Sequence, residues 1–418
     1  MIVLRLGWRN LWRNPRRSLI TISAVACGFA FLITLIGLMV GMADQMLSNG
    51  TDLLLGDAQL HHEDYLPNRS LYDTLKAERA GDLKAWMTQL SSLPELDHLS
   101  PRVYAFGLLS TGEHSAGAQL MGVDPELEVR LTSFLNGLAE RLIHATEDHP
   151  LLLGDVLAQE LEATVGSEIA VVTQSTDGSL GNDLFQVVGI LHTGLRHLDR
   201  TLAVFPLSDL QELLVLDPDE IHEIAMSIQD PMAADRFADS LNHSSSLPPG
   251  GVVQSWGDLA PQLRDYIGLA QGMYGFMIVI IALFVAVGVL NTMMMAVFER
   301  TREIGLVSAL GMGPWLIVSS ILLESFFLAL LGLGAGLGLG AWAMSYLTTQ
   351  GLDLTRWTGE LSMLGTRMDP VLKAVWGWDY VLWSAVGLLA SALLAAFFPA
   401  LRAARLDPVE ALAAPVEG

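Results

Sequence analysis

Glu299-Arg300-Thr301-Arg302-Glu303-Ile304-Gly305, followed closely by Ala309-Leu310-Gly311, is a short island of charge between two long apolar runs. The run before it, Tyr266 to Phe298, contains no Asp, Glu, Lys or Arg, and the run after it, Gly305 to Leu352, contains only Glu324. A helix that crosses a membrane needs ~20 apolar residues, and both runs are longer than that. The island therefore predicts a tight turn on one membrane face, exposed to a partner in the adjacent water.

Hydropathy predicts an α-helical membrane protein with four transmembrane helices, one N-terminal and three C-terminal. The composition agrees, because 51% of the 418 residues are hydrophobic and only 16% are charged. The expected transmembrane helices are 18–43, 267–298 with a stalk, 315–347 and 380–401. The other expected segments are an interfacial elbow helix at 1–17, a large domain at 44–266, a coupling helix at 299–314, a loop at 348–379 and a tail at 402–418. The large domain is long enough to have its own hydrophobic core.

Charge is divided unevenly along the chain. The segment from Asp44 to Tyr266 has a net charge of -24, and the rest of the chain has +2. The acidic balance argues against nucleic-acid binding, which needs a basic face. Basic residues beside the apolar runs predict that both termini and the island are cytoplasmic, and that the large domain and the 348–379 loop are outside. These residues are Arg5, Arg9, Arg13, Arg16, Arg17, Arg300, Arg302, Arg402 and Arg405.

The large domain is predicted to be mixed α+β, because apolar runs of strand length alternate with helical patterns. Strands are expected at 102–109, 118–123, 151–153, 168–173, 185–191, 202–205 and 222–228. Helices are expected from 126, at 155–164 and at 231–241. Ser, Gly, Asp and Pro mark a loop at 174–182 and a turn or linker at 244–251.

Glycines recur at alternate positions in the third apolar run, from Gly332 to Gly340. Three overlapping pairs, Gly332/Gly336, Gly334/Gly338 and Gly336/Gly340, have the small-x-x-x-small spacing that lets helix backbones approach closely in a bilayer. Two interpretations remain open for these glycines, namely close packing within this chain and an interface with another subunit.

Sequence patterns give no support for catalysis or metal binding on this chain. It has no Gly-x-x-x-x-Gly-Lys-Ser/Thr phosphate loop, no Gly-x-Ser-x-Gly and no His-Glu-x-x-His. No two of its ten histidines have the His-x-x-x-His spacing, and the densest polar cluster is His61-His62-Glu63-Asp64. Glu324, the one acid within a transmembrane run, is a functional candidate by default. Pairing with Arg300 or Arg302 is the favoured explanation for Glu324.

Several segments share motifs with one family. Leu6-Gly7-Trp8-Arg9-Asn10-Leu11-Trp12-Arg13-Asn14-Pro15 is similar to the opening of FtsX-like ABC transporter permeases, and the island with Ala309-Leu310-Gly311 resembles their coupling helix. Pro399-Ala400-Leu401-Arg402 with Asp407-Pro408-Val409-Glu410 resembles their C-terminal signature. Gly122-Val123-Asp124-Pro125 and Leu153-Gly154-Asp155 are similar to the lipoprotein-releasing, Lol-type permeases, which belong to the group that also holds the MacB-type exporters.

The resemblance implies a non-catalytic permease subunit in the bacterial inner membrane. Two permease chains, identical or homologous, would bind two copies of an ABC ATPase, which hold ATP and Mg, so no cofactor is expected on this chain. MacB-type members often carry the ATPase on the same chain; its absence here fits the Lol-like arrangement. The implied ATPase-coupling interface consists of Glu299, Arg300, Arg302, Glu303, Gly305, Ala309, Leu310 and Gly311.

Extraction of lipoproteins from the inner membrane is the preferred function. The alternatives are MacB-type efflux of a drug, peptide or other amphiphile with an adaptor, and FtsX-type transmembrane signalling to a cell-wall hydrolase. At ~1.5 Å per residue, a helix over the charge-free stretch from Tyr266 would exceed the ~30 Å hydrocarbon core and leave apolar surface above the membrane. We expect this surface to receive acyl chains, with Met273, Tyr274 and Met277 on the substrate path.

Overall fold

A computed structural model describes residues 13–66, 69–76, 81–145, 149–244, 247–353, 361–363, 366–368 and 371–407. The described residues form two compact units. A helical unit contains the residues up to 44, from 267 to 353 and from 371 to 407, and an α/β unit is formed mainly by residues 45–266. Most of the predicted elbow helix at 1–17 and most of the predicted tail at 402–418 lie outside the described residues.

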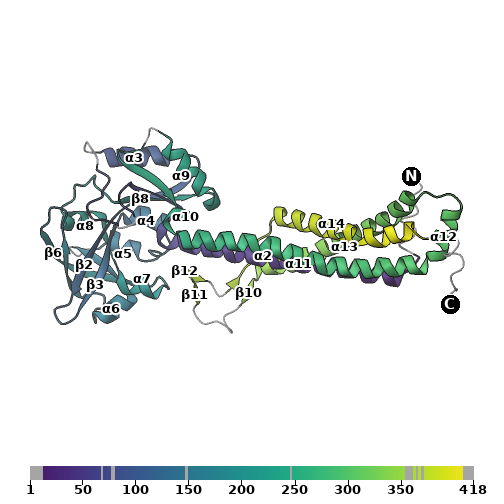
Figure 1. The fold of residues 1–418 in the computed structure, drawn as a ribbon. Coiled ribbons are helices and arrows are strands. Elements are labelled where there is room, and N and C mark those ends of the chain that lie inside the picture. The colour runs from purple at the N-terminus through teal and green to yellow at the C-terminus, as the bar shows by residue number, and fades with distance from the viewer. Residues whose placement is uncertain are drawn as a thin grey trace. The chain divides into compact units, whose positions relative to one another are not determined.

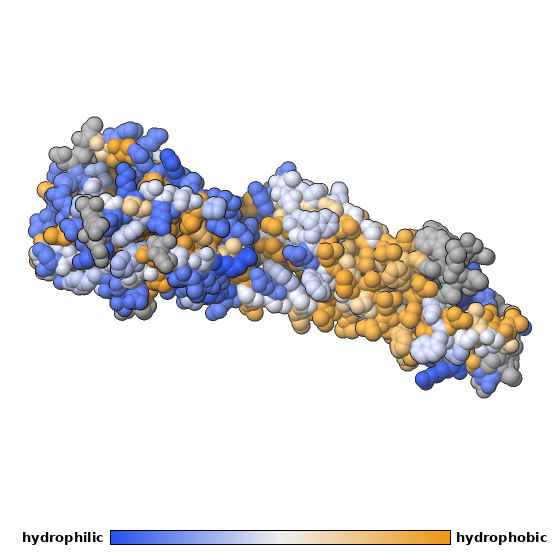
Figure 2. Space-filling view, turned by 90° about the horizontal axis from the view of Figure 1, so that it is seen from above, coloured by the Kyte–Doolittle hydropathy of each residue, from blue (hydrophilic) through white to orange (hydrophobic). Residues whose placement is uncertain are grey.

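Four long helices build the helical unit, and each is long and apolar enough to cross a membrane. They are α2 (Pro15–Gly50), α11 (Pro261–Glu299), α13 (Pro314–Thr349) and α14 (Trp378–Ala404), and the short α12 (Thr301–Ala309) joins α11 to α13. Figure 2 shows hydrophobic side chains gathered over the surface of this unit. The predicted fold class is confirmed, since one helix precedes and three follow a mixed α/β domain (Figure 1).

The helices extend further than the predicted transmembrane segments. The first runs on to Gly50, the second begins at Pro261 and the fourth begins at Trp378. Hydropathy marks only the apolar part of a helix, whereas its backbone hydrogen bonds continue into flanking polar residues. Three of the four helices begin with proline, whose fixed φ and missing N–H suit the first helical position.

Three glycines on α13 lie against α2. A Cβ atom on Gly332 would be 2.6 Å from the Val25 Cβ, and one on Gly336 would be 2.6 Å from the Ala26 carbonyl oxygen. One on Gly340 would meet the side chain of Ile33. Only glycine allows this closeness, so at these three positions the structure shows packing within the chain. By contrast, Gly334 and Gly338 point into open space among the described residues.

The segment after α13 contains short paired strands. β10 (Leu352–Asp353) pairs with β13 (Val371–Leu372), and β11 (Leu361–Met363) pairs with β12 (Thr366–Met368). The chain then crosses α2, where the Val375 amide donates a 2.9 Å hydrogen bond to the Gly37 carbonyl. A Cβ on Gly41 would collide with the carbonyl of Lys373, so a second glycine makes this crossing possible.

A nine-stranded sheet organises the α/β unit, in the order β3-β7-β4-β6-β5-β2-β8-β1-β9. The strands are β1 (Ala58–His62), β2 (Leu96–Ser110), β3 (Ser115–Val123), β4 (Pro150–Gly154), β5 (Glu168–Gln174), β6 (Leu180–Leu191), β7 (Leu202–Pro206), β8 (Glu223–Ile228) and β9 (Gly251–Ser255). The long β2 also pairs with β3, so the strands from β3 to β2 close into a ring, and β8, β1 and β9 extend from it.

Short helices cover and connect these strands (Figure 1). They are η1 (Thr51–Leu55), α3 (Asp82–Ser91), α4 (Pro125–Leu131), α5 (Ala139–Ile143), α6 (Asp155–Glu160), α7 (Arg196–Thr201), α8 (Leu207–Leu214), η2 (Pro231–Ala233), α9 (Ala234–Asn242) and α10 (Trp256–Leu259). The α4 helix begins where the sequence predicts it, because the Asp124 carboxylate accepts hydrogen bonds from the Glu126 and Leu127 amides and Pro125 occupies the first turn.

Each predicted strand of the domain is present, but two strands were not predicted. β1 and β9 pair with each other at the edge of the sheet, and β9 begins at Gly251, where a turn or linker was expected to end. The loop predicted at 174–182 is shorter than expected, since β6 already begins at Leu180 and pairs with β5. In β1 the alternation of apolar and polar residues does not indicate which side chains are buried, because the polar side chains of Gln59 and His61 are buried as fully as Leu60.

Charged side chains form a fully buried cluster between β2, β8 and α4. The Arg102 Nη2 atom lies 2.6 Å from Glu128 Oε1, and Nη1 lies 3.2 Å from Glu223 Oε1. The Tyr104 hydroxyl donates a 3.1 Å hydrogen bond to the same Glu223 oxygen. Burial raises the pKa of Tyr104, so this hydroxyl keeps its proton. His222 is also buried, and burial lowers its pKa and favours the neutral ring.

Candidate coupling site

The charged island folds into α12 and two turns that connect it to its neighbours. The φ of Arg300, −108°, breaks the helix between Glu299 and Thr301. After α12 the chain turns at Gly311, whose φ of +95° is accessible to glycine and strained for other residues. The Gly311 amide donates a 3.0 Å hydrogen bond to the Ser308 carbonyl and completes the helix end. The predicted coupling helix at 299–314 is thus a nine-residue helix with a defined turn at each end.

Glu324 is buried in α13 and paired with two arginines. Its side chain is 5% exposed, and Oε2 accepts a 2.8 Å hydrogen bond from Arg300 Nη1. The predicted pairing with Arg300 is confirmed, whereas Arg302 is exposed on the other side of the turn. Arg17 of α2 adds a second cation, with Nη2 at 3.7 Å from Glu324 Oε1. An acid in a transmembrane helix is costly unless it is paired, and these contacts supply the pairing.

Further ion pairs connect the start of the first helix to α11 and α12. Arg17 Nη1 lies 2.8 Å from Glu299 Oε2, and Arg13 pairs with Glu303. Asn14 donates a 3.1 Å hydrogen bond to the same Glu299 oxygen. The hydrogen bond from Arg13 lowers the pKa of Glu303, so this carboxylate stays charged at neutral pH. Ion pairs therefore connect residues that are far apart in sequence, at the end of α11, the start of α12 and the start of α2.

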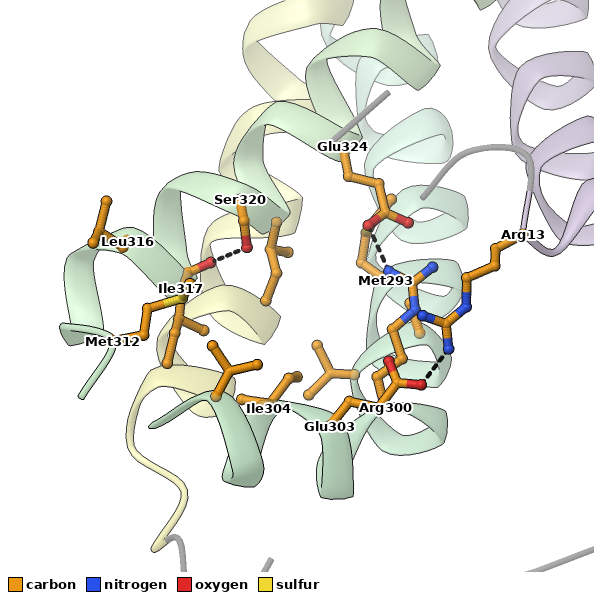
Figure 3. Close-up of a pocket in the computed structure, with 14 residues that line it drawn as sticks. Arg13, Met293, Arg300, Glu303, Ile304, Met312, Leu316, Ile317, Ser320 and Glu324 are labelled. Carbon is orange, nitrogen blue, oxygen red and sulfur yellow. Dashed lines mark hydrogen bonds and ion pairs between the residues drawn. The ribbon is translucent and has the colours of Figure 1, made fainter. Parts of the chain in front are cut away.

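A cavity of about 220 Å³ lies between α11, α12 and α13. Apolar side chains form most of its wall, and Arg13, Glu303, Arg300 and Glu324 line its charged side (Figure 3). The main apolar lining residues are Met293, Val297, Ile304, Val307, Ile317 and Ile321. The side chains of these helices therefore leave a partly open, mainly apolar space beside the ion pairs.

The outer face of α12 is exposed and combines charge with apolar surface. Arg302 is exposed, Leu306 is 52% exposed and Leu310 is 80% exposed. Of the eight residues predicted at the coupling interface, Arg302, Glu303, Ala309, Leu310 and Gly311 are exposed on α12 or the turn after it. Glu299 and Arg300 are engaged in the ion pairs, and Gly305 is buried. The face of α12 with Arg302, Leu306 and Leu310 is therefore available to a partner, while the ion pairs join the helix to the rest of the helical unit.

The residues predicted on the substrate path lie on α11. Met273 is 39% exposed, whereas Tyr274 and Met277 are partly buried against the helical core. The sequence analysis did not single out Phe276, which lies between them and is 63% exposed. A helix that is apolar on every side gives no periodic signal to separate its outward residues from its packed ones.

Two family profiles match the chain. The profile of the MacB-like periplasmic core domain matches residues 18–244, more than half of the chain, and that of the FtsX-like permease C-terminal domain matches residues 275–408. The chain belongs to the FtsX-like, MacB-type family of ABC transporter permeases. In this permease, α12, Arg300 and Glu324 fall inside the FtsX-like match, whereas Arg17 lies outside it, and the nine-stranded sheet up to β8 falls inside the MacB-like match.

Several named relatives are similar to this permease. The lipoprotein-releasing system transmembrane protein LolE of Haemophilus influenzae is 27% identical over 78% of this chain and 79% of LolE. LolC of Xylella fastidiosa, from the same kind of system, is 22% identical over 94% of this chain and 93% of LolC. The macrolide export ATP-binding/permease protein MacB of Marinobacter nauticus is 25% identical over 98% of this chain but only 60% of MacB.

Among solved structures, the crystal structure of the periplasmic region of MacB from Actinobacillus actinomycetemcomitans is similar to part of the chain. It has 14% identity and a TM-score of 0.30, and the match covers 50% of this chain and 94% of that structure.

Proposed function

We propose that this permease couples ATP hydrolysis by a separate ABC ATPase to the extraction of lipoproteins from the bacterial inner membrane. The observation that supports coupling most directly is the two-sided character of α12. Its outer face, with Arg302, Leu306 and Leu310, is free to receive a partner, and its inner side is tied by ion pairs to α2 and α13. A push on α12 would therefore be transmitted to three transmembrane helices at once.

The proposal places α12 and both termini in the cytoplasm and the α/β unit in the periplasm. Two copies of the ATPase would bind ATP and Mg and grip two permease chains, identical or homologous, through their α12 helices. The permease itself would carry no catalytic residue. Lipoprotein is the preferred substrate because two relatives aligned over most of their length, LolE and LolC, are named for lipoprotein release.

A matched set of charge substitutions distinguishes binding of the ATPase to the permease from transmission of its motion to the transmembrane helices. Arg302→Glu should reduce the amount of ATPase that co-purifies with the permease, because Arg302 is on the exposed face. Arg13→Glu, at the partner of Glu303 outside the predicted coupling interface, should leave the ATPase bound but lower transport roughly 5–30-fold, as expected for loss of about 1–2 kcal/mol of coupling. The measurements are co-purification of ATPase and lipoprotein release from proteoliposomes.

The double variant Arg13→Glu with Glu303→Arg serves as the control, since it restores the pair with reversed polarity. Recovery of transport would show that the pair acts through its attraction. If Arg13→Glu alone lost the ATPase as completely as Arg302→Glu, the ion pair between Arg13 and Glu303 would have no role in coupling separate from docking.

The exposed part of α11 provides a test of the substrate. Phe276→Glu should lower lipoprotein release at least about tenfold, because a carboxylate on a surface that receives acyl chains costs ~2.5–3.5 kcal/mol. Phe276→Leu, which keeps the surface apolar, should release normally, and both variants should retain the ATPase. Unchanged release by Phe276→Glu would rule out this surface as the acyl-chain path.

Export of an amphiphile is the second candidate function. It is favoured by the similarity to MacB, which spans 98% of this chain. An adaptor protein that co-purifies with the permease, together with no bound acylated protein, would support export over lipoprotein extraction.

A further inference from the structure

Three metal-ligating side chains meet in the α/β unit, away from the coupling site. Asp155 is the first residue of α6, His192 directly follows β6, and Asp199 lies on α7. One ligand atom from each, two carboxylate oxygens and one imidazole nitrogen, all lie within 4.8 Å of one another. His192 Nδ1 is 2.8 Å from Asp155 Oδ2 and 3.5 Å from Asp199 Oδ2. Figure 1 shows α6 and α7 at the same end of the sheet.

The backbone and neighbouring side chains hold this group in place. A Cβ on Gly154 would collide with the backbone of Asp199, so only glycine lets the two segments approach this closely. Asp199 is almost fully buried, and its Oδ1 accepts hydrogen bonds of 2.8 and 2.7 Å from the amide and hydroxyl of Thr193. Its Oδ2 is thereby directed toward His192. Support of a ligating carboxylate by hydrogen bonds to its other oxygen is usual in metal sites.

A second observation favours a cation at this group. The Oδ1 atom of Asp155 is buried, although the side chain as a whole is 29% exposed, and it accepts no hydrogen bond from any described residue. A buried carboxylate oxygen without a donor is unfavourable, and the group carries two carboxylates against a single imidazole. A divalent ion beside Oδ2, or bound by both oxygens of Asp155, would neutralise this charge.

We propose that Asp155, His192 and Asp199 form a divalent transition-metal site, with solvent in the remaining coordination positions. The nitrogen ligand favours Zn²⁺ or a similar ion over Ca²⁺ and Mg²⁺, which prefer oxygen ligands. Ligand bonds of ~2.0–2.2 Å require the His192–Asp155 contact to open slightly as the ion enters. The ion takes the place of the hydrogen bond between Nδ1 and Asp155, and the neutral ring that ligates through Nδ1 carries its proton on Nε2. Bound metal would join the β4–α6 turn, the end of β6 and α7.

Sequence patterns could not reveal this group. The sequence analysis rejected metal binding because no two histidines have the helical His-x-x-x-His spacing, and the polar cluster that it weighed was His61-His62-Glu63-Asp64. The three ligands come from different elements and are brought together only by the pairing of β4 with β6 and the packing of α7 on α6.

The test is Zn²⁺ binding by the full-length permease in detergent, purified without a histidine tag and treated with a chelator. Isothermal titration should show one tight equivalent, and His192→Ala or Asp155→Asn should weaken it at least about tenfold. His197→Ala, which removes an exposed histidine from the same helix as Asp199, should bind like the parent. Cobalt, whose visible spectrum reports its ligands, should lose its signal in His192→Ala and keep it in His197→Ala.

Binding of Zn²⁺ by His192→Ala with the parent affinity would overturn the proposal, and so would absence of tight binding by the parent. Neither result depends on transport, because the readouts are affinity and spectrum.

Discussion

Arg102→Met is expected to lower the free energy of unfolding of the α/β unit by about 3–5 kcal/mol, the cost of leaving buried charge without its partner. Arg102, Glu128 and Glu223 are each 0% exposed, so no water can replace the lost guanidinium. Burial lowers the pKa of Arg102, but Glu128, Tyr104 and Glu223 together raise it by more, and its net pKa lies well above the ordinary value. The wild-type side chain is therefore permanently charged.

Hydrogen exchange of the β2 and β8 amides in the full-length permease, followed by mass spectrometry, measures this loss. Arg236→Met is the matched control, because Arg236 is exposed on α9, and a surface change of this kind is usually within ~0.5 kcal/mol. If Glu128 and Glu223 are also replaced by leucine and glutamine, much of the stability should return, since replacing a whole buried ion group by neutral residues is often tolerated. Protection unchanged by Arg102→Met alone would show that the cluster does not hold these strands together.

Gly336→Leu is expected to destabilise the helical unit by about 3 kcal/mol, near the upper end of the usual cost of overpacking. Its Cβ would be 2.6 Å from the Ala26 carbonyl oxygen and 3.0 Å from the Ala26 Cα atom, and neither backbone atom can rotate away. α13 would have to move off α2 and lose the contacts made by Gly332 and Gly340 as well.

Gly338→Leu is the matched control on the same helix, because the structure shows nothing within 4 Å of a Cβ there. The fraction of each variant that remains monodisperse in mild detergent after heating is the measurement. We expect Gly336→Leu to be lost at lower temperature than the parent and Gly338→Leu to match it. Equal loss in both variants would contradict the view that packing within this chain explains the glycine pattern.

The sequence predicted the ion pair between Glu324 and the nearby Arg300, but it did not predict the ion pairs made by Arg13 and Arg17, which are distant in sequence from their partners. Glu324 is the single acid between Gly305 and Leu352, so a nearby cation was expected, and Arg300 is one of the two arginines that pair with it. Arg17 and Arg13 were assigned only to membrane orientation, because nothing in the sequence relates the start of α2 to α12. Ion pairs between distant segments depend on which helices pack together, and hydropathy locates the helices without showing how they pack.

Local sequence patterns explain which other features of the fold were predicted correctly and which were missed. The glycine spacing predicted close packing on α13, but alternate glycines appear on two sides of a helix, and only the structure separates Gly332, Gly336 and Gly340 from Gly334 and Gly338. Most strands of the α/β unit follow apolar patterns of strand length. β1 was missed because its alternate positions, Gln59 and His61, are polar side chains buried in the interior, where His61 bonds to Gln254 of β9.

The pairing of Arg17 with Glu324 also has a consequence for biogenesis. Helices enter the membrane in the order of synthesis, so α2 is inserted long before the ribosome has translated α13. Arg17 can pair with Glu299 once α11 is in place, but Arg300 must wait at the bilayer interface, where long arginine side chains reach water, until Glu324 arrives. Insertion of α13 then completes a salt-bridged assembly that earlier intermediates lack.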